Sequence, residues 1–192
     1  SMLVAPDGDY VLVGHTASTN FDVTGGHGLT DWWAVKVSPF GEIKWKTALG
    51  GSDDEFEPLI QQAADGGFGI FGAARSSDGD ISVFRGAIDF WVVKLSPQGT
   101  LVWEKTFGGS SYETPTTFIS TKDGGFVAAG KTGSTDFDGT GNHGNTDLFV
   151  VKLDGDGTTE WIKVLGGSKA EEMYFITQTV DHGYIIAGST ES

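Results

Sequence analysis

The sequence predicts an all-β protein, a β-propeller built from four-stranded antiparallel blades, and three observations support this prediction. The tripeptide Gly-Gly-Ser occurs three times at an interval of 58 residues, beginning at Gly50, Gly108 and Gly166. Each interval contains four short runs rich in Val, Ile, Phe and Trp, separated by Gly, Asp and Asn. No segment of useful length shows helical periodicity. Four strands in 58 residues, repeated in tandem, are typical of propeller blades.

The repeat continues along the whole chain without an insertion. It runs approximately over residues 1–58, 59–116 and 117–174, and a partial repeat of two strands covers 175–192. A single propeller region therefore spans residues 1–192, with three full blades plus two strands of a fourth. Because propellers usually close with four to eight blades, we expect a longer propeller or a ring closed by associated copies. Open blade edges favour such self-association.

The four strands are clearest in the third repeat. They are expected at 116–121, 125–132, 147–154 and 159–166. The first two join through Asp-Gly-Gly and the last two through Asp-Gly-Asp-Gly, residues that tolerate the positive φ of tight turns. A long polar loop separates the second strand from the third in every repeat.

Composition excludes several classes of partner. The chain has 12 Lys and Arg and 26 Asp and Glu, which gives a formal net charge of −14. So acidic a surface repels the phosphates of nucleic acids and anionic lipid headgroups, and nucleic-acid binding is not expected. No apolar run approaches the ~18 residues of a membrane span, so membrane insertion is not expected either. The absence of cysteine excludes disulfides and thiolate metal sites.

The stretch DGGFVAAGKTGSTDFDGTGNHGNTDLFVVKLDGDGTTEWIKVLGGS resembles the repeats of large exported and cell-surface bacterial proteins. Those repeats read approximately DGGYIVAG, a loop containing DGD and GNHG, then DYWVVKLD, GNIQW and LGGS. More distantly, the stretch is similar to the blades of quinoprotein-like propellers. The resemblance spans all three repeats. It implies a propeller in an extracellular or cell-surface setting and implies no defined chemistry.

The long loop carries oxygen side chains at positions 1, 3, 5 and 12 in every repeat. Calcium loops use this spacing, because alternate side chains point inward and a carboxylate returns at position 12. However, position 12 is Asp rather than Glu, and the second loop lacks glycine at position 6. The alternative is a turn in which Asp and Asn bond to their own backbone, and both interpretations stay open. The candidate Ca²⁺ ligands are Asn20, Asp22, Thr24, Asp31, Asp78, Asp80, Ser82, Asp89, Asp136, Asp138, Thr140 and Asp147.

Lysine, glutamate and aromatic residues also recur at the repeat interval. A lysine inside an apolar strand needs a partner when buried, and we expect it to pair with the glutamate that follows Gly-Gly-Ser. Two aromatic sets are expected to pack between blades, although exposed aromatic rings can also stack on sugars. The lysines are Lys36, Lys94 and Lys152; the glutamates are Glu55, Glu113 and Glu171; the aromatic sets are Trp45, Trp103 and Trp161, and Trp33, Trp91 and Phe149.

Histidine and known catalytic motifs give no sign of an enzyme. His27 and His143 are equivalent, but the second repeat has Arg85 at this position, so we expect hydrogen bonds to backbone or carboxylate and no zinc site. A nucleophile elbow, a phosphate loop and an HExxH motif are all absent from the sequence. We therefore expect a non-catalytic, extracellular or cell-surface structural or interaction module with a protein or glycan ligand. The alternatives are a glycan-binding propeller and a fragment of a secreted propeller enzyme.

Overall fold

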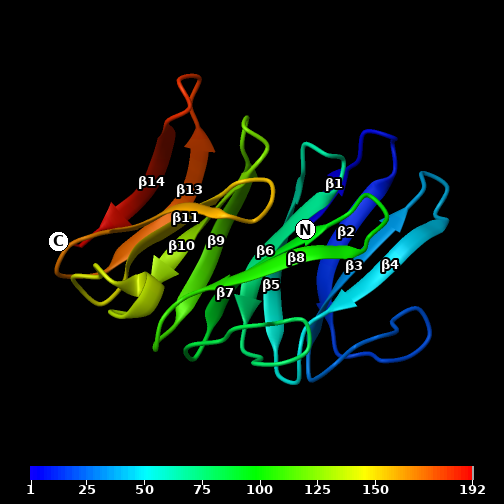
Figure 1. Cartoon of the computed structure of the whole chain (residues 1–192), viewed down its shortest axis with the longest axis horizontal. Helices are drawn as coiled ribbons and strands as arrows, with labels where there is room; N and C mark the ends of the chain where they lie inside the picture. Colours follow the sequence, from blue (N-terminus) through cyan, green and yellow to red (C-terminus); the bar gives the residue numbers. More distant parts are fainter. Residues whose placement is uncertain (192) are drawn as a thin grey trace.

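The computed structural model describes residues 1–191, which form β-strands joined by turns and loops. Three four-stranded antiparallel sheets and one two-stranded sheet follow one another along the chain, each with its strands in chain order. Figure 1 shows the sheets side by side along the long axis of the molecule. The all-β prediction is confirmed, and within the described part of the chain no helix is long and apolar enough to cross a membrane.

The four sheets are numbered here in chain order. Sheet 1 contains β1 (Met2–Val4), β2 (Tyr10–Thr16), β3 (Asp31–Val37) and β4 (Ile43–Leu49). Sheet 2 contains β5 (Glu55–Gln62), β6 (Phe68–Ala74), β7 (Asp89–Leu95) and β8 (Leu101–Phe107). Sheet 3 contains β9 (Glu113–Ser120), β10 (Phe126–Thr132), β11 (Asp147–Leu153) and β12 (Thr159–Leu165). Sheet 4 contains β13 (Glu171–Gln178) and β14 (Tyr184–Thr190), and a short 3₁₀ helix, η1, covers Phe137–Gly139.

The strands predicted in the third repeat agree with the structure to within one residue, except at the start of the first. There β9 begins at Glu113, three residues earlier than expected, because Glu113 still pairs with Thr132 of β10. The register shifts between Ala129 and Gly130, opposite Pro115. Proline donates no ladder hydrogen bond, so the sequence alone suggested a later start.

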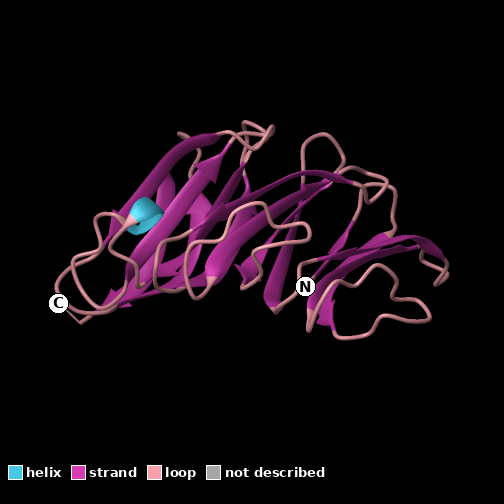
Figure 2. Ribbon diagram, turned by 60° about the horizontal axis from the view of Figure 1, so that its bottom comes forward, coloured by secondary structure: helices cyan, strands magenta, loops and turns pink. Residues whose placement is uncertain are grey.

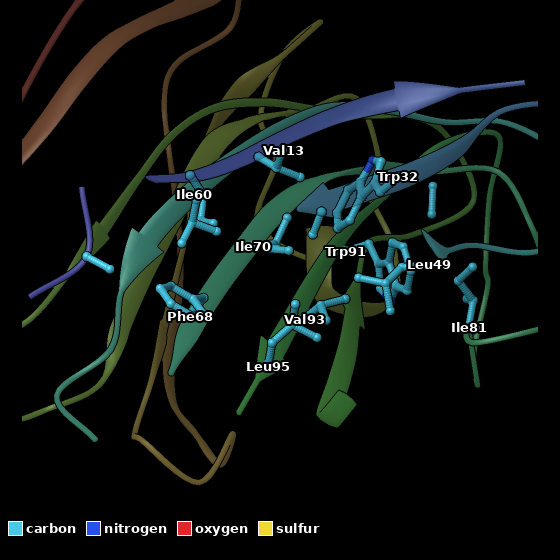
Figure 3. Close-up of a cluster of buried hydrophobic side chains, with 14 residues drawn as sticks. Val13, Trp32, Leu49, Ile60, Phe68, Ile70, Ile81, Trp91, Val93 and Leu95 are labelled. Carbon is cyan, nitrogen blue, oxygen red and sulfur yellow. The ribbon is translucent and has the colours of Figure 1, made fainter. Parts of the chain in front are cut away.

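Consecutive sheets pack face to face through apolar side chains. Between sheets 1 and 2, Trp32 of β3 and Trp91 of β7 lie with their ring centroids 4.4 Å apart (Figure 3). Phenylalanines dominate the next core, where Phe90 of sheet 2 lies 5.1 Å from Phe149 of sheet 3. A smaller core joins sheet 3 to sheet 4. Each core forms because alternate residues of a strand point to opposite faces of its sheet.

The tryptophans of the fourth strands pack against these cores, which confirms the predicted packing between blades. Trp45 Nε1 donates to the carbonyl of Pro97, 3.0 Å away in the β7–β8 turn. Trp103 makes the equivalent bond, 3.2 Å long, to the carbonyl of Gly155 in the β11–β12 turn. The ring of Trp45 lies so close to Gly99 that a Cβ there would come within 2.6 Å of it. Gly99 also has φ +78°, so both the backbone and the contact require glycine.

The outer face of sheet 1, the face turned away from sheet 2, has no other sheet of residues 1–191 packed on it, although Val35 on this face is buried by its neighbours. This face consists of Met2, Tyr10, Leu12, Trp33, Val35 and Val37. Trp33 is consequently only half-buried, whereas the equivalent Trp91 and Phe149 are fully buried. The predicted packing of this aromatic set between sheets is therefore confirmed for its second and third members, and no sheet within residues 1–191 packs against the first.

Candidate functional site at the long-loop side

The three long loops lie on one side of the row of sheets, opposite the tips of the first hairpins (Figure 1), and Figure 2 brings that side forward. They cover 17–30, 75–88 and 133–146. Position 2 has left-handed backbone in all three: φ is 55° at Phe21, 64° at Gly79 and 47° at Phe137. The loops therefore begin with the same turn.

The carboxylates at positions 1 and 3 of the second loop bind the preceding Gly-Gly-Ser segment. Asp78 Oδ1 accepts a 2.7 Å hydrogen bond from the backbone N–H of Ser52, and Asp80 Oδ2 accepts a 3.1 Å bond from Gly50. In the third loop, Asp136 and Asp138 accept the equivalent bonds from Ser110 and Gly108, at 2.8 and 3.2 Å. These aspartates thus anchor each loop to the end of the preceding sheet.

A basic side chain from the preceding loop also lies near the position-3 aspartate of the next loop. Arg85 Nη1 donates to Asp138 Oδ2 at 2.8 Å, and the guanidinium lies 5.7 Å from the ring of Phe137. At the previous junction, His27 Nδ1 is 3.9 Å from Asp80 Oδ2. Arg85 thus forms a hydrogen bond with the position-3 carboxylate of the next loop, whereas His27 at 3.9 Å lies beyond hydrogen-bond distance.

The histidine of the third loop confirms the predicted hydrogen bond to a carboxylate. His143 Nδ1 lies 3.3 Å from Asp147 Oδ2, which also accepts a 3.0 Å bond from the backbone N–H of His143. The position-12 aspartates of the other loops accept the same backbone bond, from His27 to Asp31 at 2.6 Å and from Arg85 to Asp89 at 2.8 Å. The position-12 side chain therefore closes the end of its loop.

Each position-12 aspartate also faces the glutamate that follows Gly-Gly-Ser. A Cβ at Gly108 would lie 2.3 Å from both Asp89 Oδ1 and Glu113 Oε2, so these two oxygens are close neighbours. Both residues are fully buried, and within residues 1–191 Asp89 Oδ1 has no hydrogen-bond partner. Asp31 and Asp147 have the same unpartnered Oδ1, beside Glu55 and Glu171 respectively.

Burial shifts the acidity of these pairs. It raises the pKa of Asp89 to about 7, against the lowering effect of the N–H of Arg85, and the nearby negative charge of Glu113 adds to the rise. Burial also raises the pKa values of Glu113 and Glu55 above their usual range. Two buried carboxylates side by side resist simultaneous ionisation, so the charge of this region depends on pH near neutrality.

Several of the twelve candidate calcium ligands have other partners in the structure. Besides the anchored aspartates, Ser82 donates to Glu104 and Thr140 donates to the carbonyl of Phe137. In the first loop Asn20, Asp22 and Thr24 are exposed, and Asp22 contacts Lys46 at 3.3 Å. Among residues 1–191, no three His, Asp or Glu side chains are placed to hold a metal. Calcium binding stays a prediction.

The predicted lysine–glutamate pairs are wrong. Lys94 Nζ lies 2.8 Å from Asp65 Oδ2 in the first hairpin turn of its own sheet, and Lys36 and Lys152 likewise pair with Asp7 and Asp123. Glu113 instead accepts a 2.6 Å bond from the Thr132 hydroxyl. The reason is distance along the strand: Glu113 sits beside Asp89 at the first residue of β7, and Lys94 lies five residues on, ~17 Å away.

Sequence reasoning missed the partners of these lysines, although a signal was present. Asp7, Asp65 and Asp123 recur at the same interval as the lysines and precede the glycine of each first turn. A shared period shows that two residues repeat together, and it does not show which end of a strand each occupies. The Asp–Glu pairs across the junctions were missed for the same reason.

Comparison with known proteins adds little to this geometry. No family model matches the chain, and no curated protein matches it. Among solved structures, a protein of unknown function from Bacteroides caccae aligns with 85% of this chain at 16% sequence identity and a TM-score of 0.26. This chain covers 66% of that protein, slightly under two thirds of its length. At such a score the likeness carries no argument, and function is argued from the geometry above.

Proposed function

We propose that this chain is a non-catalytic structural and interaction module, a run of β-propeller blades that acts outside the cell or at its surface. The observation that carries the proposal is the repetition of the junctions. The same positions supply the aspartates, glutamates and tryptophans that join sheet 1 to sheet 2 and sheet 2 to sheet 3. Active sites usually depend on residues unique to one part of a fold, and regular junctions favour a scaffold. The exported setting rests on the resemblance of the repeats.

Two features support propeller blades. Each full sheet is a four-stranded antiparallel meander with its strands in chain order. Neighbouring sheets pack face to face through side chains at equivalent positions of the repeats. Such sheets bury both faces only when further sheets lie on either side, which is the architecture of a propeller. The first strand of each sheet makes most of the contacts with the preceding sheet, as expected for strands near a common axis.

The outer face of sheet 1 is the interaction surface that this function requires. Tyr10 and Leu12 are 37% and 36% exposed, and Met2 is 59% exposed. A shallow hollow on this face is lined by Met2, Leu12, Trp33 and Val35 among others. A contiguous exposed apolar surface of this kind marks a site of protein association.

Binding of an apolar fluorescent dye such as ANS tests the proposal. We expect the folded chain to bind the dye and Leu12→Lys to bind much less, since the new charge lies in the hollow. Phe40→Lys is the matched control, because Phe40 is exposed in a turn and lies outside the hollow. If the folded chain binds no dye, or if both variants lose dye equally, the outer face of sheet 1 is not an interaction surface.

A glycan ligand is the second candidate, favoured by the half-buried Trp33 and the exposed Tyr10 on the same face. Aromatic rings offer flat apolar surfaces that sugars stack on. A glycan array read with the wild-type chain and with Trp33→Ala separates the two functions. A sugar signal that disappears in Trp33→Ala would replace protein association by glycan binding.

A further inference from the structure

We infer that a hollow between sheets 2 and 3 binds a small carboxylate ligand, an acidic sugar such as a hexuronic acid. The hollow has a volume of about 410 Å³, within the ~300–1,000 Å³ of small-molecule pockets. Strands β8 and β12 line it, together with the second long loop and η1, the short helix drawn cyan in Figure 2. This site is separate from the outer face of sheet 1, so it can fail its test while the proposed function stands, and the reverse also holds.

Two basic side chains line the hollow. Arg85 is held in place, because its Nη1 donates to Asp138 Oδ2 at 2.8 Å and its guanidinium lies 5.7 Å from the ring of Phe137. Within residues 1–191 its Nε and Nη2 groups have no hydrogen-bond partner, so both are available to donate to a ligand. Lys105 is exposed and forms no ion pair with any carboxylate of the described chain.

The charge of the lining matches a ligand with a single carboxylate. Asp138 is the one acidic residue among the described residues that line the hollow, so Arg85 and Lys105 leave one positive charge unbalanced. A guanidinium and an ammonium bind a carboxylate through short, charge-assisted hydrogen bonds. Large polyanions are repelled by the formal net charge of −14 on the whole chain. The hollow therefore favours a small monoanion.

The rest of the lining suits a ring that carries hydroxyl groups. Ser82 and Thr159 bring exposed hydroxyls to the hollow, and Phe107 and Ile162 bring apolar surface. Ser82 donates to Glu104, which leaves the lone pairs of its hydroxyl oxygen to accept from a ligand. Few polar groups set against apolar surface are typical of small-molecule sites. These hydroxyls favour an acidic sugar over the terminal carboxylate of a peptide.

The equivalent place between sheets 1 and 2 lacks this chemistry. It has His27, Thr47 and Glu104 where the junction of sheets 2 and 3 has Arg85, Lys105 and Ile162. Thr47 donates a 2.6 Å hydrogen bond to the carbonyl of Gly99 and so joins sheet 1 to sheet 2, whereas Lys105 makes no such bond within the described residues. All three differences make the second junction more positive. Packing of one sheet on the next does not require such changes, and a carboxylate site does.

An NMR titration of the isotope-labelled chain with sodium glucuronate, at neutral pH and constant ionic strength, tests the inference. We expect saturable shifts of the backbone N–H signals of Arg85 and Lys105. Glucose, which has the ring hydroxyls and no carboxylate, should shift them far less. Lys105→Thr, which introduces the residue of the first repeat, should weaken glucuronate binding by about tenfold or more, because a charge-assisted hydrogen bond is lost.

Two further variants sharpen the test. Lys163→Thr is the matched control, since it makes the same substitution at the equivalent exposed position of sheet 3, outside the hollow, and should bind glucuronate like the wild type. Arg85→His, again the residue of the first repeat, should weaken binding by about tenfold or more. Thermal melting shows whether each variant is folded. Should Arg85→His fail to fold because Asp138 loses its partner, Lys105→Thr decides alone.

Five other results would each overturn the inference. The absence of saturable shifts with glucuronate would exclude the site. Equal binding of glucose would show that the carboxylate is not recognised, and an equal loss in Lys163→Thr would show a diffuse effect of charge. Inorganic phosphate that binds as tightly as glucuronate would indicate a general anion site. A short peptide with a free C-terminus that binds more tightly than glucuronate would replace the sugar by a peptide.

Discussion

Sheets 1 and 2 have the same strand order, register and turn positions, yet one outer face is exposed and the other is buried. Trp91 of sheet 2 lies against Trp32 of sheet 1, whereas Trp33, its equivalent in sheet 1, meets no neighbouring sheet. The difference therefore comes from the neighbour and not from the strand. In a repeated fold of this kind, the sequence of a strand determines which face is apolar, and its place in the row determines whether that face is covered.

The same contrast runs through the loops. In the third loop, Asp138 receives hydrogen bonds from Gly108 and Arg85 of the preceding repeat. In the first loop, the equivalent Asp22 has only the exposed contact with Lys46, and Phe21 is almost completely exposed. In the third loop a preceding repeat thus supplies hydrogen bonds that no part of residues 1–191 supplies to the first loop. Each prediction below compares a covered position with its uncovered equivalent or with a matched control.

The largest expected effect is at the paired tryptophans. Trp91→Ala should lower the free energy of unfolding by about 3–5 kcal/mol, because it leaves a large cavity between sheets 1 and 2. Trp33→Ala removes the same atoms from an uncovered face and should cost less than ~1.5 kcal/mol. Urea unfolding followed by far-UV circular dichroism measures both. Equal losses would mean that the outer face of sheet 1 is covered in solution.

A rise in pH from about 4 to neutrality should destabilise the fold through the Asp89–Glu113 pair. Because burial raises the pKa of Asp89 from 3.8 to about 7, the folded state holds a proton that the unfolded chain has already released. This contribution is fully present below about pH 4 and is lost as the pH rises through about 7, by on the order of 2–4 kcal/mol. Asp123, whose pKa is lowered to about 2, acts in the opposite direction and only in acid.

Two substitutions locate this pH effect. Asp89→Asn keeps a permanent hydrogen-bond donor beside Glu113, and its stability should vary less with pH between 5 and 8, a window of about three units in which the pair titrates. Asp156→Asn, an exposed control, should follow the wild type. Urea unfolding at each pH gives the curves. A wild type whose stability is constant or increases across this window would exclude a proton held by the pair.

The turn glycines give the next comparison. Gly99 and Gly41 are equivalent and both have positive φ, at 78° and 83°. A Cβ on Gly99 would strike the ring of Trp45, whereas a Cβ on Gly41 has no atom within 4 Å. We expect Gly41→Ala to cost about 1 kcal/mol through the left-handed backbone alone, and Gly99→Ala to cost about 2–3 kcal/mol because the tryptophan must also move. Equal thermal shifts would show that Trp45 does not seal the junction in solution.

The sequence predicted the strands well and the side-chain partners poorly. Strand positions follow from alternation and turn residues, which are local, so the boundaries of β10–β12 came out within a residue. The partner of Lys94 depends on which strand end meets which turn, and period alone does not contain that information. The calcium loop was an ambiguous pattern because Asp-x-Asp serves both metal ions and backbone N–H groups. Only the position of Gly-Gly-Ser beside the next loop, visible in three dimensions, reveals what Asp78 and Asp80 bind.

A double-mutant cycle tests the corrected lysine pair. Lys94→Met and Asp65→Asn should couple by about 1 kcal/mol, since the lysine is buried while its partner is largely exposed. Lys94→Met and Glu113→Gln should be additive within about 0.5 kcal/mol, because the two groups lie at opposite ends of β7. Thermal or urea unfolding of the single and double variants provides the cycle. Strong coupling to Glu113 would restore the pairing that the repeat period suggested.

The smallest expected effect concerns calcium binding at the first long loop. Asp80 and Asp138 already accept backbone hydrogen bonds, whereas Asp22 is exposed and opposed only by Lys46. We therefore expect calorimetric titration of chelator-treated protein to show any calcium heat at the first loop alone, at most one equivalent, and Asp22→Ala to abolish it. Asp138→Ala should lower the melting temperature and leave the calcium heat unchanged, because that carboxylate joins two sheets. Two or more equivalents, with one lost in Asp138→Ala, would show that calcium displaces the anchoring bonds and that every repeat carries a site.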